Sequence, residues 1–124
     1  MVAMHPFRRF YDHRGSLLWP DGSKPATLEE ASRHPVFRFI DALEALNGGN
    51  NERDNEAAHR VARILGKSRT AGSDAHSHHG AGCHVTVFER NVRTDEDLVT
   101  ELRAGRFRPA TGLRKGNLTF YEPD

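Results

Sequence analysis

The chain has 124 residues, of which 36% are hydrophobic and 28% charged, and its formal net charge is +1. This length predicts one domain over residues 1–124, and the balanced charge gives no general argument for binding nucleic acid or an anionic membrane. No apolar run approaches the roughly 18 residues of a membrane span, and residues 1–10 lack the apolar stretch of a signal peptide. A single cysteine, Cys83, excludes an internal disulfide and a four-cysteine zinc site. We therefore expect a cytoplasmic protein.

The first third of the chain mixes short structured segments with turn residues. Residues 1–4 predict the end of a strand, and the glycines and prolines that follow predict an irregular loop over residues 7–25. The segment Thr27–Glu30 is a capping box, which predicts a short helix that stops near Pro35. Residues 36–46 fit both the spacing of a helix and the alternation of a strand, so their apolar pattern leaves both open.

The middle of the chain has a clearer pattern. Asn51 is placed to cap a helix that runs through Leu65, with Gly66 at its C-terminal cap. Residues 68–74 form a short polar segment, and residues 76–82 form a loop rich in glycine and histidine.

The last third predicts a strand, a helix and a short strand near the end. Residues 83–89 are alternating and rich in β-branched side chains, which indicates a strand. A second capping box at Thr94–Asp97 predicts a helix that Gly105 ends. The apolar face of this helix comprises Leu98, Val99 and Leu102.

Beyond that helix, residues 107–110 are expected to be extended. The tail, residues 111–124, contains a possible short strand at 118–121. The alternation of strands and helices along the chain predicts the α/β class.

The stretch Gly72–Ser77 carries the most informative chemistry. In an extended segment, Asp74 and His76 would leave the backbone on the same side. A carboxylate and an imidazole together suit a divalent metal such as Zn, Mn or Fe. The alternative is a loop in which Asp74 bonds backbone N–H groups beside an exposed His76.

The wider sequence resembles the PHP family, the polymerase and histidinol phosphatase metal-dependent phosphoesterases. Gly72–Ser77 (Gly-Ser-Asp-Ala-His-Ser) resembles the last metal motif of that family. Met4–Arg8 is similar to its His-Pro motif, and Leu43–Gly48 to its Glu-x-x-Asn-Gly stretch. Residues 92–110 are similar to its C-terminal Leu-x-x-Gly-Arg segment. The resemblance covers most of residues 1–110.

The resemblance implies a fold and a set of roles. The family folds as an irregular (βα) barrel, of which this chain would be the C-terminal half, with mostly parallel strands, flanking helices and a strand near residues 40–46. His5, Asp74 and His76 match metal ligands, and Asp74 and His76 would take part in catalysis. Glu44 is expected to face inward. The chemistry implied is hydrolysis of a phosphoester by metal-activated water.

The resemblance also implies that the metal cluster is incomplete. Family members carry a His-x-His motif, a further histidine and a bridging glutamate before the His-Pro motif, whereas only Met1–Met4 precede His5. We therefore expect the isolated chain to be inactive, and to need an N-terminal half-barrel chain or a second copy of itself. The substrate would be a phosphorylated small molecule or nucleotide. The alternative is a non-catalytic PHP-associated domain that binds a partner or a single metal.

Other candidate residues divide between functional and structural roles. Arg8 is a possible phosphate contact within a patch that also contains Arg9 and Arg14; the alternative is a solvated loop with its aromatic side chains tucked beneath. Structural or surface roles are expected for His13, His34 and His59. For His78 and His79 we expect adventitious metal binding, with a native metal role as the alternative. Cys83 is expected to be a small buried residue that begins a strand, with a ligand or nucleophile role as the alternative.

Overall fold

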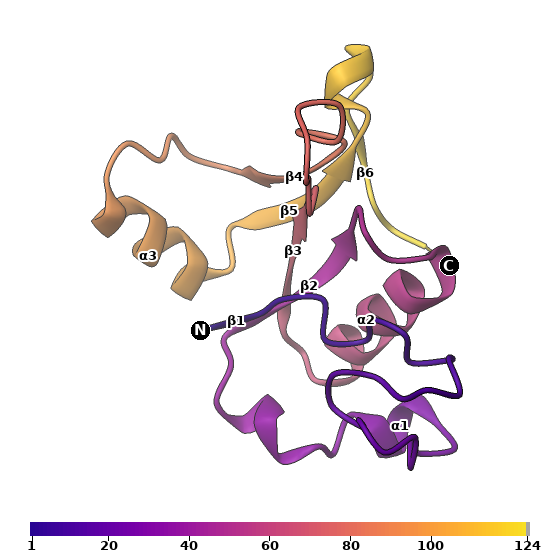
Figure 1. Ribbon diagram of the computed structural model, residues 1–124. Coiled ribbons are helices and arrows are strands. Elements are labelled where there is room, and N and C mark those ends of the chain that lie inside the picture. Colours follow the sequence, from indigo (N-terminus) through magenta and orange to yellow (C-terminus); the bar gives the residue numbers. More distant parts are fainter. Residues whose placement is uncertain (124) are drawn as a thin grey trace.

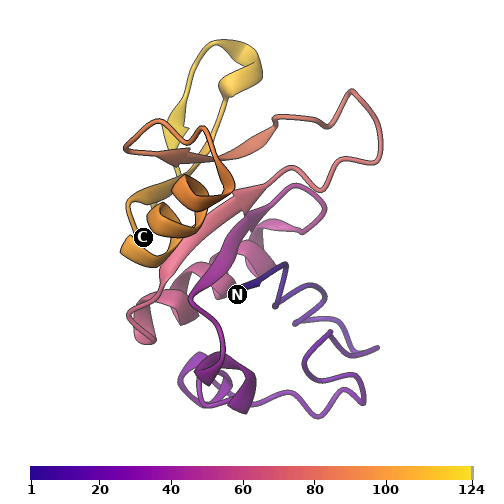
Figure 2. The same cartoon turned by 90° about the vertical axis from the view of Figure 1, so that its left-hand side faces the viewer.

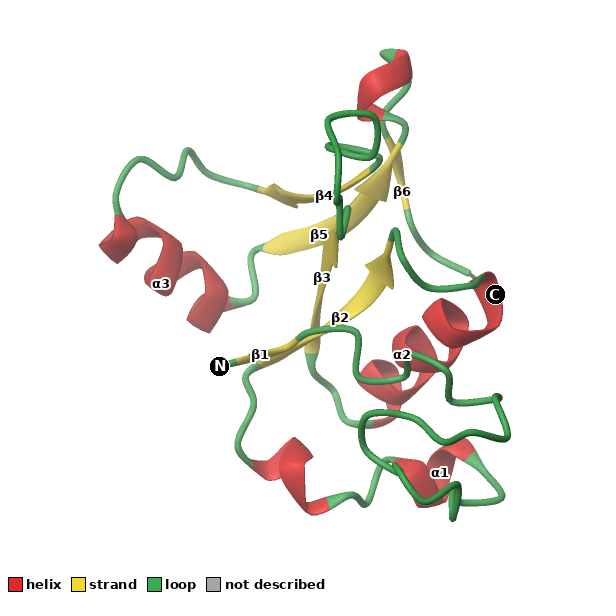
Figure 3. Ribbon diagram, in the orientation of Figure 1, coloured by secondary structure: helices red, strands yellow, loops and turns green. Residues whose placement is uncertain are grey.

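Two three-stranded sheets organise the chain, as the computed structural model shows for residues 1–123 (Figures 1 and 3). Helices flank the first sheet, and long loops join many of the elements. In chain order the elements are β1 (Val2–Ala3), α1 (Leu28–Ala31), the 3-10 helix η1 (Pro35–Arg38), β2 (Ala42–Asn47), α2 (Glu52–Ile64), β3 (Ser68–Gly72), β4 (His84–Phe88), α3 (Asp95–Ala104), β5 (Phe107–Thr111), the 3-10 helix η2 (Leu113–Lys115) and β6 (Thr119–Phe120).

The first sheet has the order β1–β2–β3, and both of its pairings are parallel. Val2 lies opposite Ala42, and Leu43 lies opposite Arg69. Parallel neighbours need a crossover connection, which α1 and η1 supply between β1 and β2, and α2 supplies between β2 and β3. Every residue of the central strand β2 is buried.

The ambiguous segment 36–46 divides into two structures. Its first residues lie in η1, and its last residues form most of β2. The strand near residues 40–46 that the family resemblance implies is confirmed, and the helical alternative is wrong there. A strand that is buried on both faces does not need to alternate apolar and polar residues. The apolar pattern of residues 36–46 therefore did not distinguish a strand from a helix.

The apolar core lies between β2, α2 and the loop of residues 7–25. The side chain of Asn51 accepts a hydrogen bond from the backbone N–H of Asp54 at 2.9 Å, which fixes the start of α2 as the sequence predicts. The core consists of buried side chains from α2, β2 and the loop, together with residues from α1, η1 and the segment before β2: Phe7, Phe10, Ala31, Phe37, Ile40, Leu43, Ala57, Ala58, Val61 and Ala62.

Aromatic side chains hold the loop of residues 7–25 against this core. Phe7 is fully buried; its ring centroid lies 5.1 Å from that of Phe10, 6.0 Å from that of Trp19 and 6.2 Å from that of Phe37. The irregular loop predicted from the sequence is confirmed, and Phe7 and Phe10 are buried beneath it, whereas Tyr11 is exposed. Packing of these buried rings, in place of the hydrogen bonds of a helix or a strand, holds the loop in one conformation.

The second sheet has the order β4–β5–β6, and both of its pairings are antiparallel. Phe88 lies opposite Phe107, and Ala110 lies opposite Phe120. The strands predicted over residues 83–89 and 118–121 are thus confirmed, as is the extended segment that forms β5.

Helix α3 lies apart from α1 and α2 (Figures 1 and 2). The capping box of Thr94 and Asp97 begins it, and Gly105, with φ of +67°, ends it, as predicted. Its apolar face is only partly covered by the described chain, because Leu98 is 36% exposed and Val99 is 44% exposed, whereas Leu102 is partly buried.

One threonine joins the two sheets. The hydroxyl of Thr86 on β4 donates to the carbonyl oxygen of Ala71 on β3 and accepts from the backbone N–H of the same residue, both at 2.9 Å. The edge of β3 that does not pair with β2 is therefore satisfied at this point by a side chain. This contact fixes where the second sheet meets the first.

The α/β class is confirmed, but the strands are not mostly parallel. Parallel pairings hold the first sheet, and antiparallel pairings hold the second, whose β5 and β6 are joined by a tight turn around η2. Residues 1–123 form no closed barrel, and the partial barrel stays a prediction. No helix within residues 1–123 has the length and apolar character needed to cross a membrane.

Replacing Thr86 by valine tests the junction of the sheets. Thr86→Val keeps the side-chain shape but leaves the N–H and carbonyl of Ala71 without this partner, so we expect the free energy of unfolding to fall by about 1–2 kcal/mol. Thr86→Ser keeps the hydroxyl and is the matched control. Urea unfolding of the three proteins would contradict this account if the valine variant were as stable as the serine variant.

Candidate metal and phosphate site

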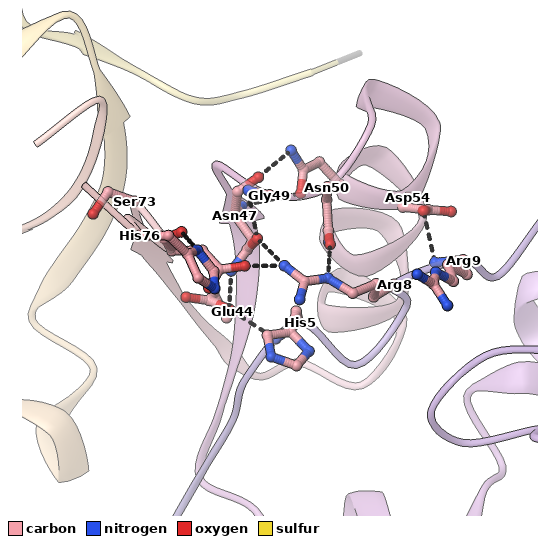
Figure 4. A network of polar contacts seen from close by, with 12 residues as sticks. His5, Arg8, Arg9, Glu44, Asn47, Gly49, Asn50, Asp54, Ser73 and His76 are labelled. Atoms are coloured by element: carbon pink, nitrogen blue, oxygen red, sulfur yellow. Dashed lines mark hydrogen bonds and ion pairs between the residues drawn. The ribbon is translucent and has the colours of Figure 1, made fainter. Parts of the chain in front are cut away.

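The carboxyl ends of the three parallel strands meet at one edge of the first sheet, where polar side chains gather (Figure 4). His5 follows β1, Asn47 closes β2, and Asp74 follows β3. In open α/β sheets, ligands bind at this edge. The fold thus brings to one place the residues that the family resemblance singles out from three distant segments.

A bulge in β2 directs the side chains of Glu44 and Asn47 toward each other. The pairing register shifts between Glu44 and Leu46. Residues three apart in a regular strand face opposite sides, yet Asn47 Nδ2 donates to Glu44 Oε2 at 2.9 Å. The same carboxylate oxygen accepts from the backbone N–H of His5 at 2.7 Å. Glu44 is buried, as expected, and it fixes the start of the loop after β1.

Arg8 is the centre of the site. Its Nη2 forms an ion pair with Asp74 Oδ2 and donates to Asn47 Oδ1 at 3.0 Å, and its Nε donates to Asn50 Oδ1 at 3.0 Å. The rigid fork of a guanidinium group can engage several oxygens at fixed angles. One side chain therefore joins the segments that follow β1, β2 and β3. We call the contacts among His5, Arg8, Glu44, Asn47, Asn50 and Asp74 the Arg8 network.

The segment after β3 is not extended, so the condition under which Asp74 and His76 would point to the same side is not met. Asp74 has φ of +48°, in the left-handed region, which a short polar side chain tolerates better than most. Its carboxylate meets Arg8, whereas His76 Nδ1 lies 2.9 Å from the Asp74 carbonyl oxygen. The hydrogen bond from Arg8 lowers the pKa of the Asp74 carboxyl below its ordinary value, so this group is held ionised.

Backbone strain is concentrated at this edge of the sheet. Among residues 1–123, the non-glycine residues with positive φ are His5 at +34°, Arg9 at +60° and Asp74 at +48°. The strained Arg9 is held in place because its backbone N–H donates to Asp54 Oδ2 at 2.8 Å. Such conformations cost free energy and persist only where their surroundings hold them, which is typical of functional sites.

Two glycines leave the space that the Arg8 network needs. A Cβ atom on Gly49 would overlap Asp74 Oδ2 and Arg8 Nη2, and a Cβ atom on Gly72 would overlap Glu44 Oε1. Neither glycine was predicted to belong to the site. The sequence does carry a signal for Gly49, which with Gly48 directly follows the Glu-x-x-Asn stretch, because close approach of other groups to the backbone requires glycine.

Two cavities of about 280 Å³ each lie beside Arg8, which lines both. Asp74 and His76 line one of them, and His5 lines the other. Three of the predicted site residues therefore share a cavity, and the fourth lies in its neighbour. The Nδ1 atom of His5 is buried and has no hydrogen-bond partner within residues 1–123.

The donors at this edge fit a divalent metal in chemical kind. His5, Asp74 and His76 offer two imidazoles and a carboxylate, and the unpartnered Nδ1 of His5 is an available ligand atom. Across residues 1–123, however, no three histidine, cysteine or acidic side chains are arranged to hold a metal ion. The carboxylate of Asp74 is engaged by Arg8 instead.

The other two arginines of the predicted patch, Arg9 and Arg14, differ in their surroundings. The guanidinium group of Arg14 pairs with Asp12 at 2.7 Å within the same loop. Arg9 lines the cavity that Asp74 and His76 also line, but among residues 1–123 it is Arg8 that forms the ion pair with Asp74. The phosphate-contact hypothesis therefore rests on Arg8.

The other candidate histidines lie outside this edge of the sheet. His59 is fully buried on α2, and its pKa falls to about 4, because burial and then the nearby Arg69 disfavour the charged ring. His78 and His79 are exposed. Cys83 precedes β4 and is half-buried, with its Sγ 3.8 Å from the carbonyl oxygen of Ser73.

Removing the guanidinium group should raise the pKa of Asp74. In Arg8→Gln the carboxyl loses its charged donor, so we expect its pKa to return toward the ordinary value of about 3.9. A carboxyl group whose pKa is lower in the folded state than in the unfolded state stabilises the fold when the pH is above the unfolded-state pKa. This stabilisation is lost as the pH falls through the folded-state pKa. Acid destabilisation should therefore be weaker in the variant.

Carboxyl-detected NMR titration measures the pKa directly. Arg33→Gln is the matched control, because Arg33 is exposed and forms no ion pair within residues 1–123. An Asp74 pKa that is the same in wild type and Arg8→Gln would show that the ion pair does not form in solution.

A comparison with family models supports the resemblance in the segment that contains the Gly-Ser-Asp-Ala-His motif. Residues 52–107 match a family model described as PHP-associated. The matched segment begins with α2, contains β3, the Gly-Ser-Asp-Ala-His loop and α3, and ends at the start of β5. Searches among curated proteins and solved structures found no match. The resemblance to the C-terminal part of the PHP family is confirmed over residues 52–107, which are similar to this PHP-associated family model.

Proposed function

We propose that this chain supplies the C-terminal metal ligands and a phosphate contact to a PHP-type phosphoesterase site. The observation that carries the proposal is the meeting of Arg8, Asp74 and His76 on one cavity, with His5 in the adjoining one. These residues come from two distant segments, and the carboxyl ends of parallel strands bring them together.

Each residue has a distinct role in this proposal. His5, Asp74 and His76 would hold a divalent Zn, Mn or Fe ion. When bound, such a metal would activate water for attack on a phosphoester. Arg8 would neutralise and orient a phosphate oxygen. Glu44 would act as a positioning residue, because its carboxylate holds the backbone N–H of His5.

Arg8 and a metal ion would compete for the same carboxylate. The guanidinium group engages Asp74 Oδ2, and two positive groups cannot both be held at short range by one carboxylate without repelling each other. Metal binding would therefore turn Arg8 away from Asp74. The freed guanidinium group would then be available to a phosphate in the same cavity.

The remaining donors would come from another polypeptide segment. Three ligands cannot position both a nucleophile and a phosphate as a multi-metal cluster does. Two surfaces offer a place for such a partner. Within the described residues, β1 pairs on one side only, and Leu98 and Val99 on α3 are exposed. An N-terminal half-barrel or a second copy of the chain would cover both the unpaired edge of β1 and the exposed apolar side chains of α3.

The second candidate function is a non-catalytic PHP-associated domain that binds a partner. The Arg8–Asp74 ion pair favours it, because a fixed cation at the carboxylate can take the structural place of a metal ion. Under this alternative the Arg8 network stabilises the edge of the sheet and no hydrolysis takes place.

Metal titration separates the two functions. We expect Mn²⁺ or Zn²⁺ to bind the wild-type chain, Asp74→Asn to abolish binding, and Arg8→Gln to strengthen it by removing the competing cation. His13→Ala is the control, because the His13 side chain is 92% exposed and lies outside the Arg8 network. Binding that is unchanged in Asp74→Asn would overturn the ligand assignment and favour the non-catalytic domain.

Turnover tests the need for a partner. The purified chain should not hydrolyse p-nitrophenyl phosphate with added Mn²⁺, since its own residues complete no metal cluster within positions 1–123. Metal-dependent hydrolysis by the chain alone, lost in His76→Ala, would show that no further ligands are required.

A further inference from the structure

A large cavity lies in the second sheet, away from the Arg8 network. It encloses about 590 Å³ beside the first residue of β4, the last residue of β5 and the turn around η2. In Figure 1 this turn is the yellow segment at the top, beyond the end of β5. Cavities of 300–1,000 Å³ are typical of small-molecule sites. Six polar side chains line it: His84, Thr111, Arg114, Lys115, Asn117 and Thr119.

The segments that form this cavity contain no acidic residue. Residues 76–88 and residues 107–121 include arginine, lysine and histidine but neither aspartate nor glutamate, although the chain has 17 acidic residues in all. The positive charge of Arg114 and Lys115 is therefore not balanced locally. Neither forms an ion pair within residues 1–123, and Glu122, the acid that follows in sequence, is taken by Arg69 and Arg108.

One buried polar atom in the cavity wall lacks a partner. His84 Nδ1 is buried and makes no hydrogen bond in the part of the chain that the structure describes. Burial lowers the pKa of His84, so the ring is neutral and retains one N–H donor. An unpaired buried donor or acceptor is costly, which indicates that a further group completes its hydrogen bonding.

We propose that this cavity, hereafter the anion cavity, binds a phosphate-bearing small molecule. Arg114 and Lys115 would hold the phosphate, and His84 would bond a polar atom of the ligand. Two unpaired cations at one concave site match a single phosphate group, whereas a nucleic acid backbone would need a longer track of positive charge.

The anion cavity is independent of the proposed metal site. Cys83 is the point where the two approach each other, since it lines the cavity and its Sγ lies 3.8 Å from the carbonyl oxygen of Ser73. Arg8, Asp74 and His76 do not line it. Anion binding here therefore needs no metal ion and no phosphoesterase activity.

NMR titration of the isotope-labelled chain with AMP, inorganic phosphate and adenosine, all in EDTA, tests the proposal. We expect saturable shifts of the amides of residues 83–84 and 111–119 with AMP, and none with adenosine. Shifts with inorganic phosphate as well would show that the phosphate group alone suffices; shifts with AMP alone would show that the organic part contributes. Either result supports the cavity.

The double variant Arg114→Gln, Lys115→Gln should weaken AMP binding by about tenfold or more, because both charged donors are removed. The matched control is Arg33→Gln, Arg38→Gln, which makes the same charge change at exposed arginines on other elements and should leave affinity within about twofold. Lys115→Gln alone should give an intermediate loss, and retained amide dispersion checks that each variant is folded.

Three results would overturn the proposal. They are equal weakening in the two double variants, shifts confined to residues 5–9 and 47–50, and no saturable shift at millimolar AMP. The metal titration of the Arg8 network can fail without affecting any of these measurements, so the two proposals are tested separately.

Discussion

The ion pair between Arg8 and Asp74 is the contact on which the edge of the first sheet depends. The two residues are 66 positions apart in sequence, and the pair joins the segment after β1 to the segment after β3. Because Arg8 also donates to Asn47 and Asn50, the segment after β2 is held by the same side chain. One guanidinium group therefore contacts all three loops at this edge of the sheet.

Several features of the backbone are consequences of this contact. The bulge in β2 turns Asn47 toward Glu44, and Asn47 in turn accepts from Arg8. Gly49 has no side chain, which leaves room for the two charged groups. The positive φ of Asp74 carries its carboxylate to Arg8 and away from an extended path. The strained backbone of the loop after β3 is thus held in place by the hydrogen bond from Arg8 in the loop after β1.

The elements predicted from the sequence were those with local signals. Asn51 and Thr94 each cap a helix by accepting a hydrogen bond from the backbone N–H three positions later. Such caps can be recognised from a few neighbouring residues in the sequence. β3 was not predicted as a strand, because Ser68–Gly72 has no apolar alternation. It is extended because β2 supplies a ladder on one side and Thr86 satisfies Ala71 on the other.

The candidate site could be predicted only in part. The family motifs brought His5, Arg8, Asp74 and His76 into consideration, and the fold places all four at one edge. The pairing of Arg8 with Asp74 has no local signal, since it depends on a contact between distant loops. The same holds for the anion cavity, which forms only where β4, β5 and the turn around η2 meet.

A double-mutant cycle on the ion pair is the most direct test of this account. The free energy of unfolding would be measured for wild type, Arg8→Gln, Asp74→Asn and the variant with both changes. If the pair organises the edge of the sheet, the loss in the double variant should be clearly smaller than the sum of the two single losses. Losses that simply add would show that Arg8 and Asp74 act independently, and would contradict the central role of their contact.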